Sequence, residues 1–250
     1  MRRRLLENGE GGYTPDFGEY HIVALYDVQD ISTQTPLIYD KGSVSKMEID
    51  GVVQATPVLK YQFTETGIHE AKFKVTTYIG YMFQGIKTVV EIYLSDYITE
   101  IGSFSYCSNL SKLSLTDNLT GWTGGGMFIS CTKLKEIYIP EGTHSLGDSR
   151  GYGGSWFKRS GLTGLVIPST VTVIYGNFSS YITNCESIIC KPTTPPTLLN
   201  TIELPKEDTL IPFESTNNCP IYVPAESVEA YKTANRWTDY LASRIFPMPT

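Results

Sequence analysis

Histidine, tryptophan and paired cysteine motifs are scarce in this chain. The scarcity of histidine and of paired cysteines argues against metal binding and acid–base catalysis. The 250 residues include 3 His, 3 Trp and 5 Cys. Histidine is the commonest metal ligand and the usual proton carrier near neutral pH, so three of them provide little for metal or acid–base chemistry. No Cys-x-x-Cys pair occurs in the sequence, and no spacing of the cysteines matches a zinc-binding pattern. We therefore expect a non-enzymatic protein with no catalytic residue, no metal site and no cofactor.

Positive charge and long apolar runs are also in short supply. The chain has 20 Lys and Arg against 26 Asp and Glu, which gives a net charge of −6. Proteins that bind nucleic acids neutralise phosphates with Lys and Arg, so we expect no nucleic-acid partner. No stretch approaches the roughly 18 apolar residues that span a bilayer, so we expect no membrane-spanning segment.

The sequence leaves the localisation open. The one basic cluster, Arg2-Arg3-Arg4, is followed by only two apolar residues, Leu5-Leu6, before the chain turns polar. A secretion signal needs an apolar run of about 7–15 residues at that point. We expect either that an export signal has been removed from this chain or that the protein never had one.

The feature that organises the chain is a repeat of apolar residues. Each unit begins with a strand motif of the form apolar-x-x-apolar-x-apolar, and the first residues of these motifs are Val89, Leu110, Leu134 and Leu162, with a shorter motif at Ile188. A unit ends on an apolar residue, with a cysteine or a substitute three residues later and the next motif three residues after that. Self-similarity with this period predicts stacked repeats that share one core.

Three of the five cysteines, Cys107, Cys131 and Cys185, hold the same position in their units. This equivalence favours a column of small buried side chains over a redox or ligand site. A disulfide and a metal site remain the alternatives for the cysteines.

The residues before the repeat predict two further parts. Residues 1–18 are rich in glycine and polar residues, and we expect a flexible N-terminus. Residues 19–80 contain short β patterns separated by turns, including a hairpin signal at Asp50-Gly51. They predict either a small antiparallel, sandwich-like domain or a flat sheet that covers the open end of the stacked repeats.

The repeat itself is predicted to extend over residues 81–224, with an irregular Pro-containing segment at 191–218. Residues 225–250 begin with apolar residues at helical spacing and predict a short helical cap at the C-terminus. Taken together, the patterns predict a mainly β fold with a parallel sheet in the repeat.

The repeat unit resembles a known family. The pattern Leu-x-x-Ile-x-Ile-Pro…Val-Thr-x-Ile…Phe-x-x-Cys-x-x-Leu is fullest in residues 98–115 and 160–175, and it is similar to the BspA-like leucine-rich repeats of Bacteroidetes. Residues 190–196 and 221–246 are similar to the ending of such proteins. The resemblance implies a right-handed solenoid, a motif without catalytic residues, and a location at the cell surface or outside the cell. It also implies partners among host matrix or cell-surface proteins.

Two candidate binding surfaces follow from the repeat. Because alternate side chains of a strand face opposite ways, the residues between the buried positions should form a column on the open face of the sheet. These residues are Tyr93, Ser114, Tyr138, Val166 and Tyr222. The second surface is the Gly-rich insertion at 147–157, with Tyr152 and Trp156. Tyrosine and tryptophan suit binding because each joins a rigid apolar ring to a polar group.

These features favour recognition of a protein or adhesion through the sheet face and its loops. The first alternative is a carbohydrate-binding module of a glycan-handling system, favoured by the 17 Tyr and the acidic surface. The second alternative is a structural component of a phage or prophage. The sequence does not determine the oligomeric state.

Overall fold

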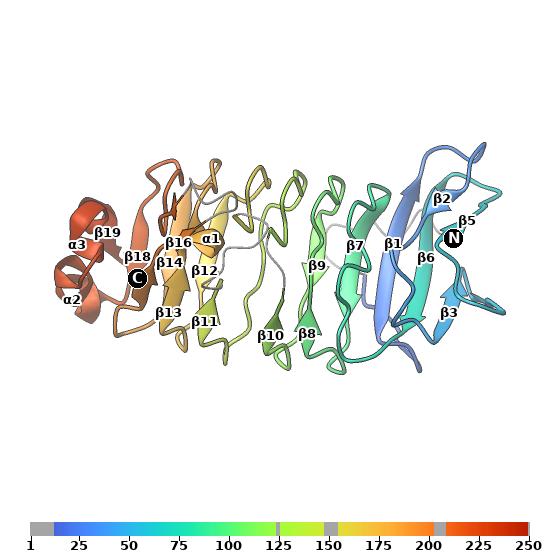
Figure 1. Ribbon diagram of the computed structural model, residues 1–250, viewed down its shortest axis with the longest axis horizontal. Helices are drawn as coiled ribbons and strands as arrows, with labels where there is room; N and C mark the ends of the chain where they lie inside the picture. The colour runs from blue at the N-terminus through green and yellow to red at the C-terminus, as the bar shows by residue number, and fades with distance from the viewer. Residues whose placement is uncertain (1–12, 124–125, 148–154, 203–208, 250) are drawn as a thin grey trace.

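The computed structural model describes residues 13–123, 126–147, 155–202 and 209–249. The molecule is mainly β and elongated, with the repeats stacked along its long axis (Figure 1). Antiparallel strands lie at the N-terminal end of this stack and short helices at the C-terminal end (Figure 1). Within the described ranges, no helix has the length and apolar character needed to cross a membrane.

The N-terminal strands join the sheet of the first repeats. Six strands form this sheet in the order β4-β3-β6-β1-β7-β9. Their bounds are β1 (Ile22–Val28), β3 (Lys46–Ile49), β4 (Val52–Val53), β6 (Gly67–Lys74), β7 (Val89–Leu94) and β9 (Lys112–Ser114). Pairing is antiparallel from β4 to β7 and parallel between β7 and β9. The N-terminal strands therefore extend the sheet of the first repeats.

The hairpin predicted at Asp50-Gly51 is confirmed between β3 and β4. Asp50 and Gly51 both have positive φ angles, 49° and 81°. Such angles match the right-handed twist of the flanking strands in a two-residue hairpin loop. A small separate pair, β2 (Thr35–Pro36) with β5 (Lys60–Tyr61), lies beside this sheet.

The later repeats build parallel sheets on two sides of the stack. The first sheet has the order β12-β14-β18-β19, and the second has the order β11-β13-β15. Their strands are β11 (Ser145–Leu146), β12 (Gly164–Ile167), β13 (Val173–Tyr175), β14 (Ser187–Cys190), β15 (Thr197–Leu199), β18 (Ile221–Val223) and β19 (Ile245–Pro247). A further parallel pair joins β8 (Glu100–Ile101) to β10 (Gly121–Trp122), and an antiparallel pair joins β16 (Thr201–Ile202) to β17 (Thr209–Leu210).

One step of the stack lacks a β-ladder. The sequence predicted a strand at 134–139, but among the described residues no ladder joins this segment to β9 or to β12, so that prediction is wrong. Its apolar residues are nevertheless buried, with Leu134, Ile137 and Ile139 between 0% and 6% exposed. Side-chain packing and a backbone hydrogen bond from Thr163 to the Lys135 oxygen therefore hold the segment in place without a ladder. The interruption leaves β9 and β12 as the edges of two separate sheets.

The core follows the repeat positions. A row of phenylalanines runs along it, and the rings of Phe83, Phe104, Phe128 and Phe157 are nearly parallel, with centroids 5.4–6.0 Å apart. Cys107 and Cys131 lie beside this row, and their thiols donate to the carbonyl oxygens of the preceding turn. Burial raises the pKa of the Cys107 thiol to about 12, so this thiol is protonated and unreactive at neutral pH. These two cysteines are packing residues.

Short helices close the C-terminal end of the core. They are α2 (Val228–Thr233) and α3 (Trp237–Tyr240), flanked by the 3-10 turns η2 (Ala225–Ser227) and η3 (Ala242–Arg244); one further helical turn, α1 (Gly176–Ser179), lies within the repeats. Tyr231 and Trp237 are fully buried, and their side chains donate to the backbone oxygens of Pro192 and Pro196 at 2.7 and 2.8 Å. The two aromatic residues thereby attach the helices to the Pro-containing segment that leaves the repeat register.

Candidate functional site

Most of the predicted column lies in register on two separate sheets. Tyr93 pairs with Ser114 between β7 and β9. Val166 and Tyr222 share a second ladder, in which Ile189 of β14 lies between them. Tyr138 belongs to the segment without a ladder and bridges the two parts. Its hydroxyl donates to Asp117 Oδ1 of the preceding repeat at 2.7 Å.

Tyr93 does not belong to the exposed surface, contrary to its place in the predicted column. It is 4% exposed because residues 13–17 cross the sheet face above it. The Tyr13 ring lies 5.2 Å from the Tyr93 ring, and the Tyr13 hydroxyl donates to Glu70. Burial, together with a hydrogen bond to Glu91, raises the pKa of Tyr93 well above its usual value. A segment of this chain therefore already occupies the N-terminal part of the face.

The second predicted surface is also corrected. Trp156 is 1% exposed, and its ring packs against Trp122 and Phe178 at centroid distances of 5.7 and 5.2 Å. The Trp156 side chain is therefore part of the core and cannot contact a partner directly. Tyr152 lies outside the described residues.

A groove occupies the sheet face where the ladder is interrupted. Its volume is about 830 Å³, and it crosses the edge strand β9, the segment 135–139, the edge strand β12 and part of β14. Three of the predicted residues line it, namely Ser114, Tyr138 and Val166. Tyr138 is 50% exposed and Val166 is 37% exposed. The groove begins one strand beyond Tyr93, where the covering segment 13–17 no longer protects the face.

The charged residues at the groove are mostly basic, although the whole chain is acidic. Lys112, Lys135 and Lys191 line it, together with the acidic residue Glu136. Lys112 also lies over the Tyr93 ring at 4.9 Å, and Lys191 forms an ion pair with Glu141 at 3.4 Å. A partner with carboxylate groups would meet a locally favourable potential here, which raises association rate and specificity more than affinity.

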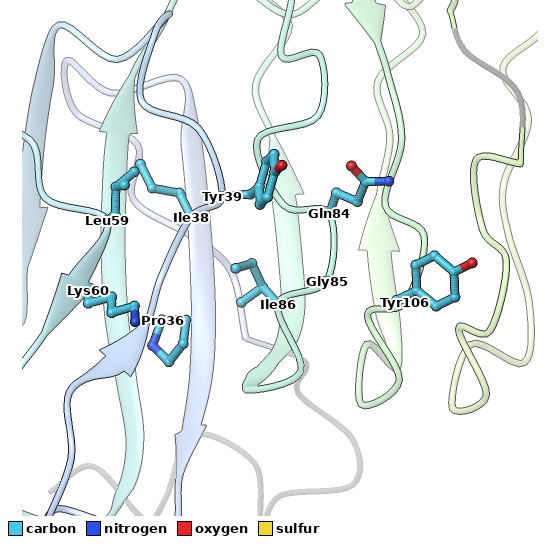
Figure 2. Close-up of a pocket in the computed structure, with 9 residues that line it drawn as sticks. All are labelled: Pro36, Ile38, Tyr39, Leu59, Lys60, Gln84, Gly85, Ile86 and Tyr106. Atoms are coloured by element: carbon cyan, nitrogen blue, oxygen red, sulfur yellow. The ribbon is translucent and has the colours of Figure 1, made fainter. Parts of the chain in front are cut away.

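A second, smaller pocket lies where the β2–β5 pair meets the first repeats. Its volume is about 480 Å³, and Figure 2 shows Gln84 between the side chains of Tyr39 and Tyr106. The two tyrosines are 64% and 52% exposed, while Ile38 and Ile86 form a buried apolar base. Gln84 donates to Ser105 Oγ at 3.1 Å, which fixes its amide between the rings.

The comparisons with known proteins agree with the repeat. A family model described as a BspA-type leucine-rich repeat region, in six copies, matches residues 56–189. The chain belongs to this family. No curated protein sequence matches the chain. The family match includes residues 56–80, which precede the first strand motif, and it ends within β14.

The BspA-type motif distinguishes residues that are buried in the core from residues that lie on the surface and can contact a partner. Motif positions such as Leu110, Leu134 and Ile188 are 0% exposed. The intervening positions supply the groove and the rest of the column, and the sequence missed two of them. Ile189 lines the groove, and Phe246 of β19, 46% exposed, pairs with Tyr222 at the end of the column.

Both residues lie where the repeat becomes irregular, so spacing alone could not reveal them. The pairing of β14 with β12 and of β19 with β18 could be read only from the folded chain. In the described ranges there is no group of three or more His, Cys, Asp or Glu side chains placed to hold a metal ion.

Proposed function

We propose that this protein is a protein-recognition module that binds an extended, acidic segment of its partner in the sheet-face groove. The observation that carries the proposal is the groove over β9, the segment 135–139 and β12, which is lined by exposed Tyr138 and Val166. Such a groove suits an extended segment, because its apolar and aromatic lining contacts side chains while a few polar groups fix their orientation. We further infer that the stacked repeats form a right-handed solenoid, as the family motif implies.

The chemistry of the partner follows from the lining of the groove. The tyrosine ring and Val166 suit an apolar or aromatic side chain, and the three lysines suit carboxylates. The protein's own segment 13–17 provides a precedent, because it lies on the same face with Tyr13 against Tyr93. The family resemblance supports partners exposed on a host matrix or on another cell, which makes adhesion the biological role we propose.

A peptide-library selection tests the groove. Displayed random 16-residue peptides are selected on the purified protein, and the enriched sequences are synthesised with a fluorescent label. We expect enrichment of Asp or Glu next to an aromatic residue, and weaker binding at higher salt because exposed charge pairs are screened. The change Tyr138→Ser with Val166→Ser should weaken binding at least about tenfold, as expected for loss of a central aromatic contact.

The matched control is Tyr39→Ser, which removes an exposed tyrosine outside the groove. It should leave the dissociation constant of the selected peptides within about twofold. If no acidic sequence is enriched, or if the groove variant binds as tightly as the unchanged protein, the groove is not the recognition site. Binding to immobilised matrix proteins, compared between the same variants, tests the adhesion role separately.

Carbohydrate binding at the second pocket is the second candidate function. Two exposed tyrosine rings with a fixed amide between them, as in Figure 2, match the pairing of apolar plates and polar groups that suits a sugar. A glycan array should then give signals that Tyr39→Ser with Tyr106→Ser abolishes and that Tyr138→Ser leaves unchanged. An array without signals would exclude this second candidate and would not affect the groove.

A further inference from the structure

The thiols of Cys185 and Cys219 lie against each other in the core. Their Sγ atoms share a hydrogen bond at 2.7 Å, and the side chains are 0% and 3% exposed. The other three cysteines have different partners. Cys107 and Cys131 donate to backbone oxygens, and Cys190 contacts the Tyr231 hydroxyl at 3.4 Å. Among the five cysteines, Cys185 and Cys219 are therefore the pair that the fold brings together.

The two cysteines occupy neighbouring turns of the stack. Cys185 precedes β14 and Cys219 precedes β18, and these two strands are parallel neighbours in which Ile188 pairs with Ile221. Adjacent strands lie about 4.8 Å apart, and disulfides join Cα atoms that are about 4.4–6.8 Å apart. The spacing of the turns thus suits a covalent bond between the two sulfur atoms.

Arg244 lies beside Cys219 and favours the deprotonated form of its thiol. Its Nη2 lies 3.6 Å from Cys219 Sγ and donates to Thr216 Oγ1 at 2.8 Å, and its Nε donates to the Cys219 carbonyl at 2.9 Å. The hydrogen bond with Cys185 and the positive charge of Arg244 lower the pKa of Cys219 below its usual value, although burial opposes them. The thiolate is the nucleophile in thiol–disulfide exchange, so Cys219 is the attacking residue.

We propose that Cys185 and Cys219 are an oxidisable dithiol whose disulfide closes the irregular excursion between β14 and β18. The oxidant is a low-molecular-weight disulfide. The Cys219 thiolate attacks one of its sulfur atoms, forms a mixed disulfide and releases one thiol. Cys185 then loses its proton and attacks Cys219 Sγ, which releases the second thiol. Two protein thiols are oxidised, and one external disulfide is reduced to two thiols.

The bond would restrain the segment that departs from the repeat. That segment contains β15, β16 and β17 and in the reduced protein is attached through the buried side chains of Tyr231 and Trp237. Closing a loop of about 35 residues removes conformational entropy from the unfolded chain, and a protein of this size should gain roughly 10 °C in melting temperature. The effect concerns stability and does not depend on the groove.

The test is to refold the reduced protein in reduced and oxidised glutathione and to alkylate it after unfolding. Refolding lets the oxidant reach both thiols before the core closes. We expect three alkylated cysteines in place of the five free thiols, a mass about 2 Da lower before alkylation, and a 185–219 link by peptide mapping.

Two variants make the result decisive. Cys219→Ser should retain four alkylated thiols under the same conditions and show no change of melting temperature between reduced and oxidised samples. The control Cys131→Ser removes another buried cysteine of the repeats and should still form the bond. Five reactive thiols after refolding, a link through any other cysteine, or a melting temperature unchanged by oxidation would each overturn the proposal.

Discussion

Replacing Phe128 with alanine should lower the free energy of unfolding by about 4 kcal/mol. Phe128 is fully buried, and its ring stacks on Phe104 at 5.8 Å and on Phe157 at 5.4 Å. Truncation removes the apolar surface of the ring and leaves a cavity between two turns. Both neighbouring turns are held by backbone hydrogen bonds, from Phe104 to Met127 and from Phe128 to Trp156, so they cannot collapse fully into the space.

Urea unfolding followed by circular dichroism measures this effect. The midpoint should fall while the slope of the transition stays unchanged, because the surface exposed on unfolding is nearly the same. The control is Phe246→Ala, which truncates a 46% exposed phenylalanine and should cost less than about 1 kcal/mol. Equal losses for the two variants would mean that the stacked row carries no special share of the stability.

Gly161→Ala should destabilise the fold by about 3 kcal/mol. A Cβ atom at this position would lie 2.2 Å from the backbone oxygen of Thr132 and 3.0 Å from that of Leu134. The amide of Gly161 donates to the Cys131 oxygen at 3.1 Å, so the close approach belongs to the contact between successive turns. These backbone atoms of the preceding turn cannot rotate away as a flexible side chain would, so the two turns must separate.

Gly164→Ala is the matched control for this change. Its new Cβ would meet only the Ser187 oxygen at 3.8 Å, an ordinary van der Waals contact. Gly164 lies three residues further along the same repeat, on β12. The control should unfold within about 0.5 kcal/mol of the unchanged protein in the same urea titration. A Gly161→Ala protein as stable as this control would show that the turns can separate without cost.

Sequence patterns predicted the buried part of the fold well. Leu110, Leu113 and Leu165 are buried as the repeat requires, because the burial of an apolar side chain depends on its position in the unit and on little else. The cysteine column follows the same rule at Cys107 and Cys131. The Asp50-Gly51 hairpin was equally readable, since the required backbone angles are a local property of those two residues.

The exposed surface could not be read in the same way. Tyr93 and Tyr138 hold equivalent positions, yet one is 4% and the other 50% exposed. The difference arises from residues 13–17, which are distant in sequence and cross the sheet above Tyr93 only. Trp156 was predicted to be exposed because it lies in a Gly-rich insertion, but its ring packs against Trp122 and Phe178.

The sequence by itself determined that the chain stacks repeats and which residues form their core. It also contains no recognisable catalytic or metal-binding motif. Tertiary structure alone decided where the ladder is interrupted, which tyrosines remain exposed and which two of the five thiols meet. The physical reason is the range of the interactions. Burial repeats with each unit, whereas the groove and the Cys185–Cys219 contact depend on how distant segments come together.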